Sequence, residues 1–367
     1  MFPSFSPTPL LMIDTLTIPT QRTTASRLPE VDFDQLEFGK TFADHMLVVD
    51  YQNGEWQEPQ IVPYGDMTVS PANSALHYGQ AIFEGMKAYK NQDGEIFIFR
   101  PQDNLSRLNA SAERMCMPAV PEEIFMQGLS QLIRLDAEWV PNFTGSALYI
   151  RPFMFATDGM LGVRPSDSYR FMIITCPVGL YYNKPLRVRF EEKYVRSAEG
   201  GAGFAKNAGN YGAAMYPTKL AQEEGYNQLI WTDASEHKYV EESGTMNAMF
   251  VIDGRLITPA LSTSILDGIT RRSVLQLAHD WGMPVEERKV SALEILAAHA
   301  AGTLQEAFGV GTAATIAPIS VIGYQGEDFT LPTAPADAFS HRVTAALAAI
   351  RSGEATDTHG WMVRVQS

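Results

Sequence analysis

Residues 86–115, MKAYKNQDGEIFIFRPQDNLSRLNASAERM, decide the fold class of this chain. The first half carries Asp93-Gly94, a dipeptide typical of two-residue hairpin turns, between two strand-like flanks. The second half repeats apolar residues at helical spacing from Leu105 to Met115, which predicts an amphipathic helix. A hairpin followed directly by a helix indicates a mixed α/β architecture.

The rest of the chain repeats this mixture of hairpins, strands and helices. Further hairpins are expected at Asn53-Gly54 in LVVDYQNGEWQ and at Asp253-Gly254 in MFVIDGRLITP. We also expect strands over 146–156 and 169–178, and helices over 122–139 and 269–282. Hairpins in both halves argue for mixed α+β layers and against a purely parallel sheet.

The best candidate for a domain boundary is VGLYYNKPLRV, in which Asn, Lys and Pro interrupt two apolar segments. Pro, Ser and Thr are frequent at the start of the chain, where no helical or strand period is sustained. We therefore expect a loosely ordered arm over 1–30, a small N-terminal α/β domain over 31–178, a linker over 179–187 and a larger C-terminal domain over 188–367.

Composition limits the partners and the compartment. The chain has 367 residues and a formal net charge of −14, so its surface should repel nucleic acid and anionic membranes. No apolar run approaches the length of a membrane helix, and the N-terminus lacks the pattern of a signal peptide. Its 2 cysteines form neither a disulfide framework nor a metal-ligand cluster. We expect a soluble cytoplasmic protein without a metal site.

Three stretches could carry chemistry. In GGAGFAKNAGNYG, residues 200–212, Lys206 is the only charged residue among many glycines. A lysine held among small residues can lose hydration and become a nucleophilic amine, although the composition alone favours an ordinary lysine in a flexible loop. In YVEESGTMN, Glu241 and Glu242 are neighbours on an expected strand, so one carboxylate should point inward and the other should be solvated.

The third stretch is LSTSILDGITRRSV, where a hydroxyl-rich loop enters a helix at Asp267-Gly268. Such a helix start can bind phosphate through its free N–H groups, but simple capping by Asp267 explains the pattern equally well. A dinucleotide motif, G-x-G-x-x-A, occurs at Gly309–Ala314. Because a helical stretch, residues 292–308, is expected before it and an extended segment after it, the strand-then-helix context of an NAD site is absent.

Seven short blocks occur in a characteristic order: FEGMKAY, DNLSRL, LYIRP, AKNAGNYG, EESGTMN, LDGITR and GVGTA. From Phe38 onward this series resembles the branched-chain aminotransferases of the class-IV group, which depend on pyridoxal 5'-phosphate (PLP). D-amino-acid and amine transaminases and aminodeoxychorismate lyases share the central lysine and glutamate, but the LYIRP and EESGTMN blocks favour the branched-chain enzymes. An NAD dehydrogenase and a non-catalytic PLP-carrying scaffold are the alternatives from other classes.

The resemblance implies PLP fold type IV, in which a smaller N-terminal α/β domain and a larger C-terminal domain with a barrel-like sheet enclose PLP in a homodimer. It implies transfer of the amino group between Leu, Ile or Val and 2-oxoglutarate. By resemblance Lys206 forms the Schiff base and carries the proton, Glu242 pairs with the pyridine nitrogen, and Tyr211 faces the phenolate. The groups implied for the phosphate are Arg107, the N–H groups of Ile269 and Thr270, and the Thr312 hydroxyl.

The resemblance also implies an aromatic substrate pocket. Its implied residues are Phe38, Tyr78, Phe83, Tyr149, Tyr181 and Thr245, with Arg151 at the rim and the Thr312-Ala313 backbone near the substrate α-carboxylate. Two positions depart from the family pattern. Asp267 replaces a usual Pro and brings a negative charge close to the phosphate unless it is turned away, and Ala208 replaces a Gly without an expected loss of function.

Overall fold

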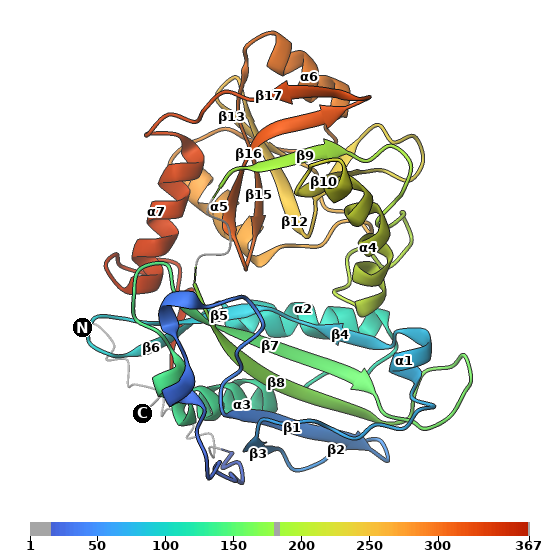
Figure 1. Cartoon of the computed structure of the whole chain (residues 1–367), viewed down its shortest axis with the longest axis vertical. Helices are drawn as coiled ribbons and strands as arrows, with labels where there is room; N and C mark the ends of the chain where they lie inside the picture. The colour runs from blue at the N-terminus through green and yellow to red at the C-terminus, as the bar shows by residue number, and fades with distance from the viewer. Residues whose placement is uncertain (1–15, 180–183, 366–367) are drawn as a thin grey trace, which may run out of the picture.

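Two nine-stranded sheets make up the core of the molecule. The computed structural model describes residues 16–179 and 184–365, and Figure 1 shows one sheet in each of two bodies stacked along the long axis. The first sheet contains the strands β1 His45–Gln52, β2 Glu55–Trp56, β3 Gln60–Pro63, β4 Ala81–Phe83, β5 Met86–Lys90, β6 Ile96–Phe99, β7 Ala147–Ala156, β8 Tyr169–Val178 and β18 Met362–Arg364. The second contains β9 Leu186–Phe190, β10 Gln228–Thr232, β11 Val240–Ser243, β12 Met246–Ile252, β13 Arg255–Thr258, β14 Val285–Glu287, β15 Leu304–Gly311, β16 Thr315–Tyr324 and β17 Glu327–Thr330.

The first sheet is antiparallel, in the order β18-β6-β5-β7-β8-β1-β2, with β3 beside β1 and β4 beside β7. Its helices are α1 Ser74–Tyr78, α2 Pro101–Arg114 and α3 Glu122–Leu135. The apolar faces of α2 and α3 pack against the strands in one core, in which Leu108 and Phe125 are fully buried. This packing explains why α2 forms where the apolar spacing predicts it.

The second sheet closes on itself. It runs β11-β10-β9-β16-β15-β12-β13-β14, and β11 also pairs with β12, so six strands form a closed barrel. The helices of this body are α4 Ala208–Glu223, α5 Ile269–Asp280, α6 Ala292–Ala300 and α7 Phe339–Ser352. The predicted mixed α/β fold with a barrel-like second sheet is therefore confirmed.

Most local predictions agree with the structure. At Asn53-Gly54 and Asp253-Gly254 both residues have positive φ, as the predicted tight turn requires. The hairpin at Asp93-Gly94 also forms, but only Gly94 has positive φ. There the Asn91 side chain accepts hydrogen bonds from the N–H groups of Asp93 and Glu95, so the loop is longer than a two-residue turn.

One local prediction is wrong. The stretch before Gly309 was expected to be helical as far as residue 308, but α6 ends at Ala300 and Leu304–Gly311 is strand β15. Gly302, with φ of +72°, separates the two, and β15 is stabilised by pairing with β12 and β16. A strand, not a helix, follows Gly309–Ala314, so the motif lacks the context of a dinucleotide site.

The two ends of the chain differ from the predicted division. Residues 16–30 are not loose throughout, since Ile18 is buried in the first core and Thr20 forms a β-bridge with Ile61. Strand β18 pairs with β6, so the last strand belongs to the first sheet although it lies in the segment assigned to the C-terminal domain. Part of the predicted linker, residues 180–183, lies outside the described residues. No helix in the described part of the chain is long and apolar enough to cross a bilayer.

Candidate active site

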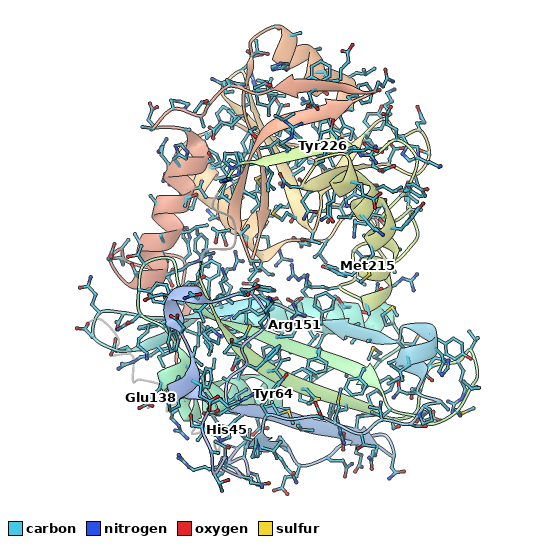
Figure 2. The ribbon with its side chains drawn as sticks, in the orientation of Figure 1. His45, Tyr64, Glu138, Arg151, Met215 and Tyr226 are labelled. Atoms are coloured by element: carbon cyan, nitrogen blue, oxygen red, sulfur yellow. The ribbon has the colours of Figure 1, made fainter. Side chains whose placement is uncertain are left out.

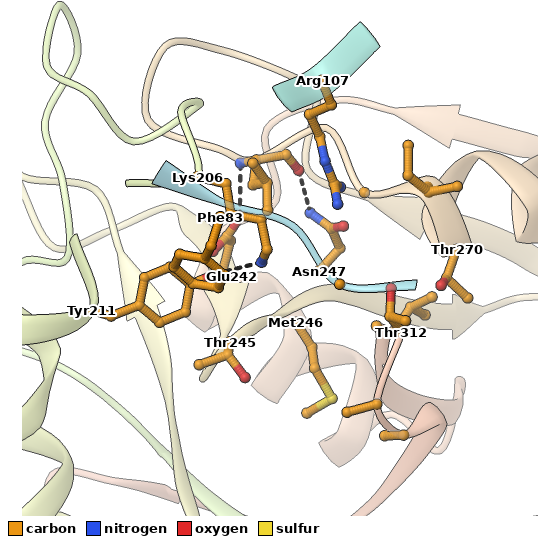
Figure 3. A pocket seen from close by; sticks show the side chains of 18 of the residues that line it. Phe83, Arg107, Lys206, Tyr211, Glu242, Thr245, Met246, Asn247, Thr270 and Thr312 are labelled. Carbon is orange, nitrogen blue, oxygen red and sulfur yellow. Dashed lines mark hydrogen bonds between the residues drawn. The ribbon is translucent and has the colours of Figure 1, made fainter. Parts of the chain in front are cut away.

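One cavity between the two bodies gathers most of the residues implied by the sequence (Figure 3). They arrive from both bodies and from widely separated parts of the chain. The predicted residues that line the cavity are Phe38, Phe83, Arg107, Tyr149, Arg151, Lys206, Tyr211, Glu242, Thr245, Ile269, Thr270, Thr312 and Ala313.

Two predicted residues do not line this cavity. Tyr78 lies at the end of α1, is 44% exposed and contacts the ring of His77. Tyr181 falls outside the described residues. The substrate-binding roles of both tyrosines remain predictions.

Lys206 is held by both bodies and points its amine into the cavity. Its backbone N–H donates to Ser111 Oγ at 2.9 Å, and its carbonyl accepts from the Phe83 N–H at 3.0 Å. Its Nζ donates to the Tyr211 hydroxyl at 2.7 Å (Figure 3) and lies 4.8 Å from the centroid of the Phe83 ring. Among the described residues no carboxylate forms an ion pair with Lys206. Hydrogen bonds therefore hold the amine in position without an ion pair to any described carboxylate.

The glycine-rich segment around Lys206 is ordered by side-chain hydrogen bonds. Asn207 caps α4 by accepting from the N–H of Asn210, and the Asn210 amide donates to the carbonyls of Ala202 and Ala205 at 2.8 and 2.9 Å. This network holds the segment in place, which argues against the flexible loop that the composition favours, while the role of Lys206 remains a prediction.

Glu242 faces the cavity from strand β11. One carboxylate oxygen accepts the Leu266 N–H at 2.8 Å, and the other lies 3.1 Å from Nε of Arg196. Burial raises the pKa of Glu242, and the Arg196 guanidinium opposes that rise. Glu242 is thus a buried carboxylate, and Arg196 is the one cation that forms an ion pair with it in the described part of the chain.

Glu241 departs from its expected position. It is only 8% exposed and not solvated, because the loop that carries Ser264 covers the other face of β11. The Ser264 hydroxyl donates to its carboxylate at 2.5 Å, and the second carboxylate oxygen has no partner among the described residues. Burial raises the pKa of Glu241 to about 7.

The opposite end of the cavity is built to receive an anion. Helix α5 begins after Gly268, whose residue type offers no capping side chain, and the Asp267 carboxylate instead pairs with Arg272. Capping by Asp267 is therefore wrong, and its negative charge is turned away from the helix start. The first N–H groups of α5, those of Ile269 and Thr270, stay available at the wall of the cavity.

Arg107 joins this anion site from helix α2. Its Nε and Nη2 donate to the two oxygens of Glu84 at 2.7 and 2.8 Å, and its Nη1 donates to the Asp267 carbonyl at 2.9 Å. These contacts use three of the five N–H donors of a guanidinium, so two are left for a ligand. Glu84 is completely buried and orients the guanidinium.

The approach to the anion site requires glycine. A Cβ at Gly268 would lie 2.0 Å from Oδ1 of Asn247, whose amide donates to the Leu266 carbonyl at 2.8 Å (Figure 3). Only a glycine lets the start of α5 lie this close to β12. The same crowding occurs at Gly85, where a Cβ would lie 2.2 Å from the Tyr149 hydroxyl.

The remaining wall is aromatic with one cation in it. Arg151 lies where β7 faces the second body (Figure 2), with its guanidinium carbon 4.7 Å from the centroid of the Phe83 ring. Its Nη2 donates to the Tyr149 hydroxyl at 3.0 Å, and its buried Nε has no hydrogen-bond partner among the described residues. Phe38 meets Tyr149 edge to face at 4.8 Å. The spacing of Tyr149 and Arg151 places both side chains at this wall, as predicted.

Sequence reasoning missed three polar residues of the site: Glu84, Arg196 and Asn247. Glu84 adjoins the predicted Phe83, and Arg196 is the last cation before the glycine-rich segment. Both residues could therefore have been predicted as members of charged pairs. Asn247 ends the EESGTMN block but carries no charge that would mark it. The partner of each becomes visible only in the folded chain.

The fold and this site define an aminotransferase of class IV. The family model "Amino-transferase class IV" matches residues 81–322. A Bacillus subtilis (strain 168) protein named branched-chain-amino-acid transaminase 1 is 46% identical over 339 residues, which cover 91% of this chain and 95% of that protein.

Two solved structures show the same architecture. The branched-chain aminotransferase of Thermoproteus uzoniensis with norvaline superposes with a TM-score of 0.72 at 26% identity, covering 88% of this chain and 100% of that one. The T.th. branched-chain amino acid aminotransferase complexed with N-(5'-phosphopyridoxyl)-L-glutamate superposes with a TM-score of 0.70 at 25% identity, covering 87% and 98%. The chain belongs to the class-IV aminotransferase family, within its branched-chain aminotransferases.

The enzyme is PLP-dependent, as the family is, and the donor set of the cavity fits that cofactor. A phosphate dianion suits the guanidinium of Arg107 together with the helix start at Ile269 and Thr270. A buried carboxylate, that of Glu242, suits a protonated pyridine nitrogen. The amine of Lys206, which forms no ion pair with a described carboxylate, suits attachment to an aldehyde.

Proposed function

We propose that this enzyme transfers the amino group between Leu, Ile or Val and 2-oxoglutarate, giving branched-chain 2-oxo acids and L-glutamate. The observation that carries the proposal is the aromatic wall of the cavity with Arg151 inside it. Apolar rings would receive an aliphatic side chain, and Arg151, which has no carboxylate partner among the described residues, would receive the second carboxylate of glutamate.

The substrate amino group and Cα would lie near Lys206. Bound in the cavity, PLP supplies an electron sink that stabilises negative charge developing at the substrate Cα. Lys206 Nζ takes and returns the Cα proton, and the Tyr211 hydroxyl, which accepts a hydrogen bond from it, keeps the amine oriented. Glu242 would hold a proton on the pyridine nitrogen, and Arg196 beside it favours the ionised carboxylate against the effect of burial.

Similar proteins support both substrates of the proposed exchange. The T. uzoniensis structure contains norvaline, an unbranched aliphatic amino acid, and the T.th. structure contains a phosphopyridoxyl adduct of L-glutamate. An aliphatic and an acidic ligand therefore occur in relatives of the same fold. In this chain the aromatic rings and Arg151 would divide those two tasks.

A substrate panel tests the proposal. The purified PLP-loaded enzyme is incubated with 2-oxoglutarate and either L-Leu, L-Ile, L-Val, D-alanine or a primary amine, and glutamate is measured. We expect turnover with the three branched-chain amino acids and little with the others. Preferential turnover of D-alanine or of the amine would assign the enzyme to another branch of class IV, and no amino transfer at all would indicate a non-catalytic protein.

We also propose a homodimer. Apolar side chains are exposed on the loop between β7 and β8, on α1 and on α4, which lie on one side of Figure 1; among them are Leu161, Val163 and Met215, and Val163 is 90% exposed. A second copy of the chain would cover this surface. Light scattering after size exclusion should give twice the mass of one chain, and a single-chain mass would contradict the dimer.

We propose the cytoplasm as the location of the enzyme, because its low cysteine content is typical of proteins in a reducing compartment.

A further inference from the structure

Lys87 is a buried lysine that the proposed mechanism does not use. It lies on β5 in the first body, is 8% exposed, and forms no ion pair with any described residue. Its Nζ donates to the carbonyl of Ala313 at 2.8 Å, across to the turn between β15 and β16 in the second body. A buried ammonium that donates only to a backbone carbonyl needs an explanation, because burial of an unpaired charge is costly.

The turn that accepts this hydrogen bond lines the cavity. The backbone N–H groups of Thr312, Ala313 and Ala314 form no hydrogen bond with any described residue. The Ala313 carbonyl and the Ala314 N–H belong to one planar trans peptide unit, so they point in opposite directions. The ammonium of Lys87 therefore polarises an N–H group that points away from it and makes that group a stronger donor to an anion.

A second cation holds the other end of the same turn. Arg351 on α7 donates from Nη1 to the Thr315 hydroxyl at 2.9 Å, and Thr315 has a φ of +63°, a backbone conformation that residues other than Gly rarely adopt. The turn is therefore held at Ala313 and at Thr315 by two cations from outside the barrel.

We propose that Lys87 is a positioning residue for the substrate α-carboxylate, which acts through the Ala313–Ala314 peptide by holding the turn and by adding positive charge behind it. This inference rests on the proposed function. It extends that function by assigning to the first body a part in binding the carboxylate that every amino-acid and 2-oxo-acid substrate shares.

The charge of Lys87 makes this binding depend on pH. Burial, together with the nearby charge of Arg351, lowers the pKa of Lys87 to about 7. The other titratable groups that face it are Tyr149 on the paired strand β7 and Tyr89 on β5, and burial raises the pKa of Tyr89. Lys87 is thus charged mainly below pH 7, so a carboxylate ligand should bind more weakly as the pH rises from 6 to 9.

The test compares Lys87→Met and Lys87→Arg with the control Lys90→Met. Lys90 lies on the same strand and also donates to a backbone carbonyl, that of Ala137 at 2.8 Å, but within the first body. Binding of 4-methylvalerate, which is leucine without its amino group, to each PLP-loaded enzyme is measured by calorimetry from pH 6 to 9. The KM and kcat for leucine are measured alongside, and circular dichroism checks the folding of each variant.

At pH 6.5 we expect Lys87→Met to raise the Kd of 4-methylvalerate and the KM of leucine by about 10-fold, as for the loss of one charge-assisted hydrogen bond, with little change in kcat. Lys90→Met should match the wild type. Because arginine stays charged, Lys87→Arg should lose less affinity at pH 9 than the wild type does.

Equal Kd values for Lys87→Met and Lys90→Met would overturn the inference. If Lys87→Met does not fold, the Lys87→Arg profile decides, and a profile identical to that of the wild type would overturn it. If the wild-type enzyme binds 4-methylvalerate and the Lys87 variants bind it equally well, only the role of Lys87 is refuted. A wild-type enzyme that neither binds it nor transaminates leucine refutes the proposed function and this inference together.

Discussion

In the proposed exchange, the side chain of Arg151 would serve two unlike substrates. Its guanidinium carbon lies 4.7 Å from the Phe83 ring centroid and 5.3 Å from that of Tyr149. The faces of aromatic rings attract a cation, so the charge can remain in an apolar wall while a leucine side chain is bound. When glutamate enters, the same guanidinium can pair with its γ-carboxylate, which could not be buried unpaired without a penalty of several kcal/mol.

We expect Arg151→Met to lower kcat/KM for glutamate and 2-oxoglutarate by about 10- to 100-fold, the effect of losing a charge-assisted hydrogen bond. Leucine and its 2-oxo acid should be affected much less, because methionine keeps an apolar wall. Single-turnover measurement of each half-reaction separates the two effects. Equal losses in both would assign Arg151 to the architecture or to the α-carboxylate.

Strand β11 presents two buried carboxylates that face opposite ways. Glu242 faces the cavity and Arg196, whereas Glu241 faces Ser264. A carboxylate beside the pyridine nitrogen matters most when negative charge develops on the substrate, so it contributes more to the transition state than to cofactor binding.

We therefore expect Glu242→Gln to retain PLP but to lower kcat strongly, by about 100-fold or more. Glu241→Gln, which is the matched control on the same strand, should keep most of the activity. Steady-state kinetics of the two PLP-loaded variants decide between them. If Glu241→Gln loses activity and Glu242→Gln keeps it, the roles assigned to the two residues must be exchanged.

Glu241 should instead affect how the free energy of unfolding depends on pH. Its pKa is about 7 in the folded protein and about 4.5 in an unfolded chain, so the folded state binds more protons between these values. Stability contributed by the protonated form is therefore lost as the pH rises from about 4.5 to 7. Glu241→Gln removes that loss, and its Tm should exceed the wild-type Tm by about 2 °C or more at pH 8 but not at pH 5. Equal Tm differences at both pH values would contradict this assignment.

The N-terminus of α5 makes a separate prediction, because Gly268 leaves no room for a side chain. Gly268→Ala would place a Cβ 2.0 Å from the Asn247 amide oxygen and displace either the helix start or Asn247. We expect PLP to bind about 10-fold more weakly, since the N–H groups of the helix start would lose their position. Titration of the apoprotein with PLP measures this.

Gly212→Ala in α4 is the control for this change, since a Cβ there meets nothing within 4 Å. It should bind PLP as the wild type does. An unchanged affinity in Gly268→Ala would show that the start of α5 does not contribute to the phosphate site.

The site exists only where the two bodies of the molecule meet, and this decides how much of it the sequence could predict. Hairpins and helices such as α2 and α5 follow from local periodicity and turn residues, so their patterns were sufficient. The order of seven short blocks predicted the main site residues because a family likeness contains long-range information that no single motif carries.

Contacts between segments that lie far apart in the sequence could not be predicted from local patterns. The closure of the barrel by β11 and β12, the return of β18 to β6, and the ion pair of Glu84 with Arg107 each join segments whose proximity no local pattern encodes. Burial of both Glu241 and Glu242 was missed for the same reason, since the loop that covers Glu241 comes from a later part of the chain. The cavity is thus a property of the assembled fold.

The central claim is that the amine of Lys206, held by Tyr211 in this cavity, is the reactive group of the enzyme. Borohydride reduction of the PLP-loaded protein, followed by peptide mass spectrometry, tests it most directly. We predict one modified peptide containing residue 206, and a Lys206→Ala variant that lacks the visible absorbance band and loses transamination by several orders of magnitude. Modification of another lysine instead, above all of the buried Lys87, would contradict the assignment.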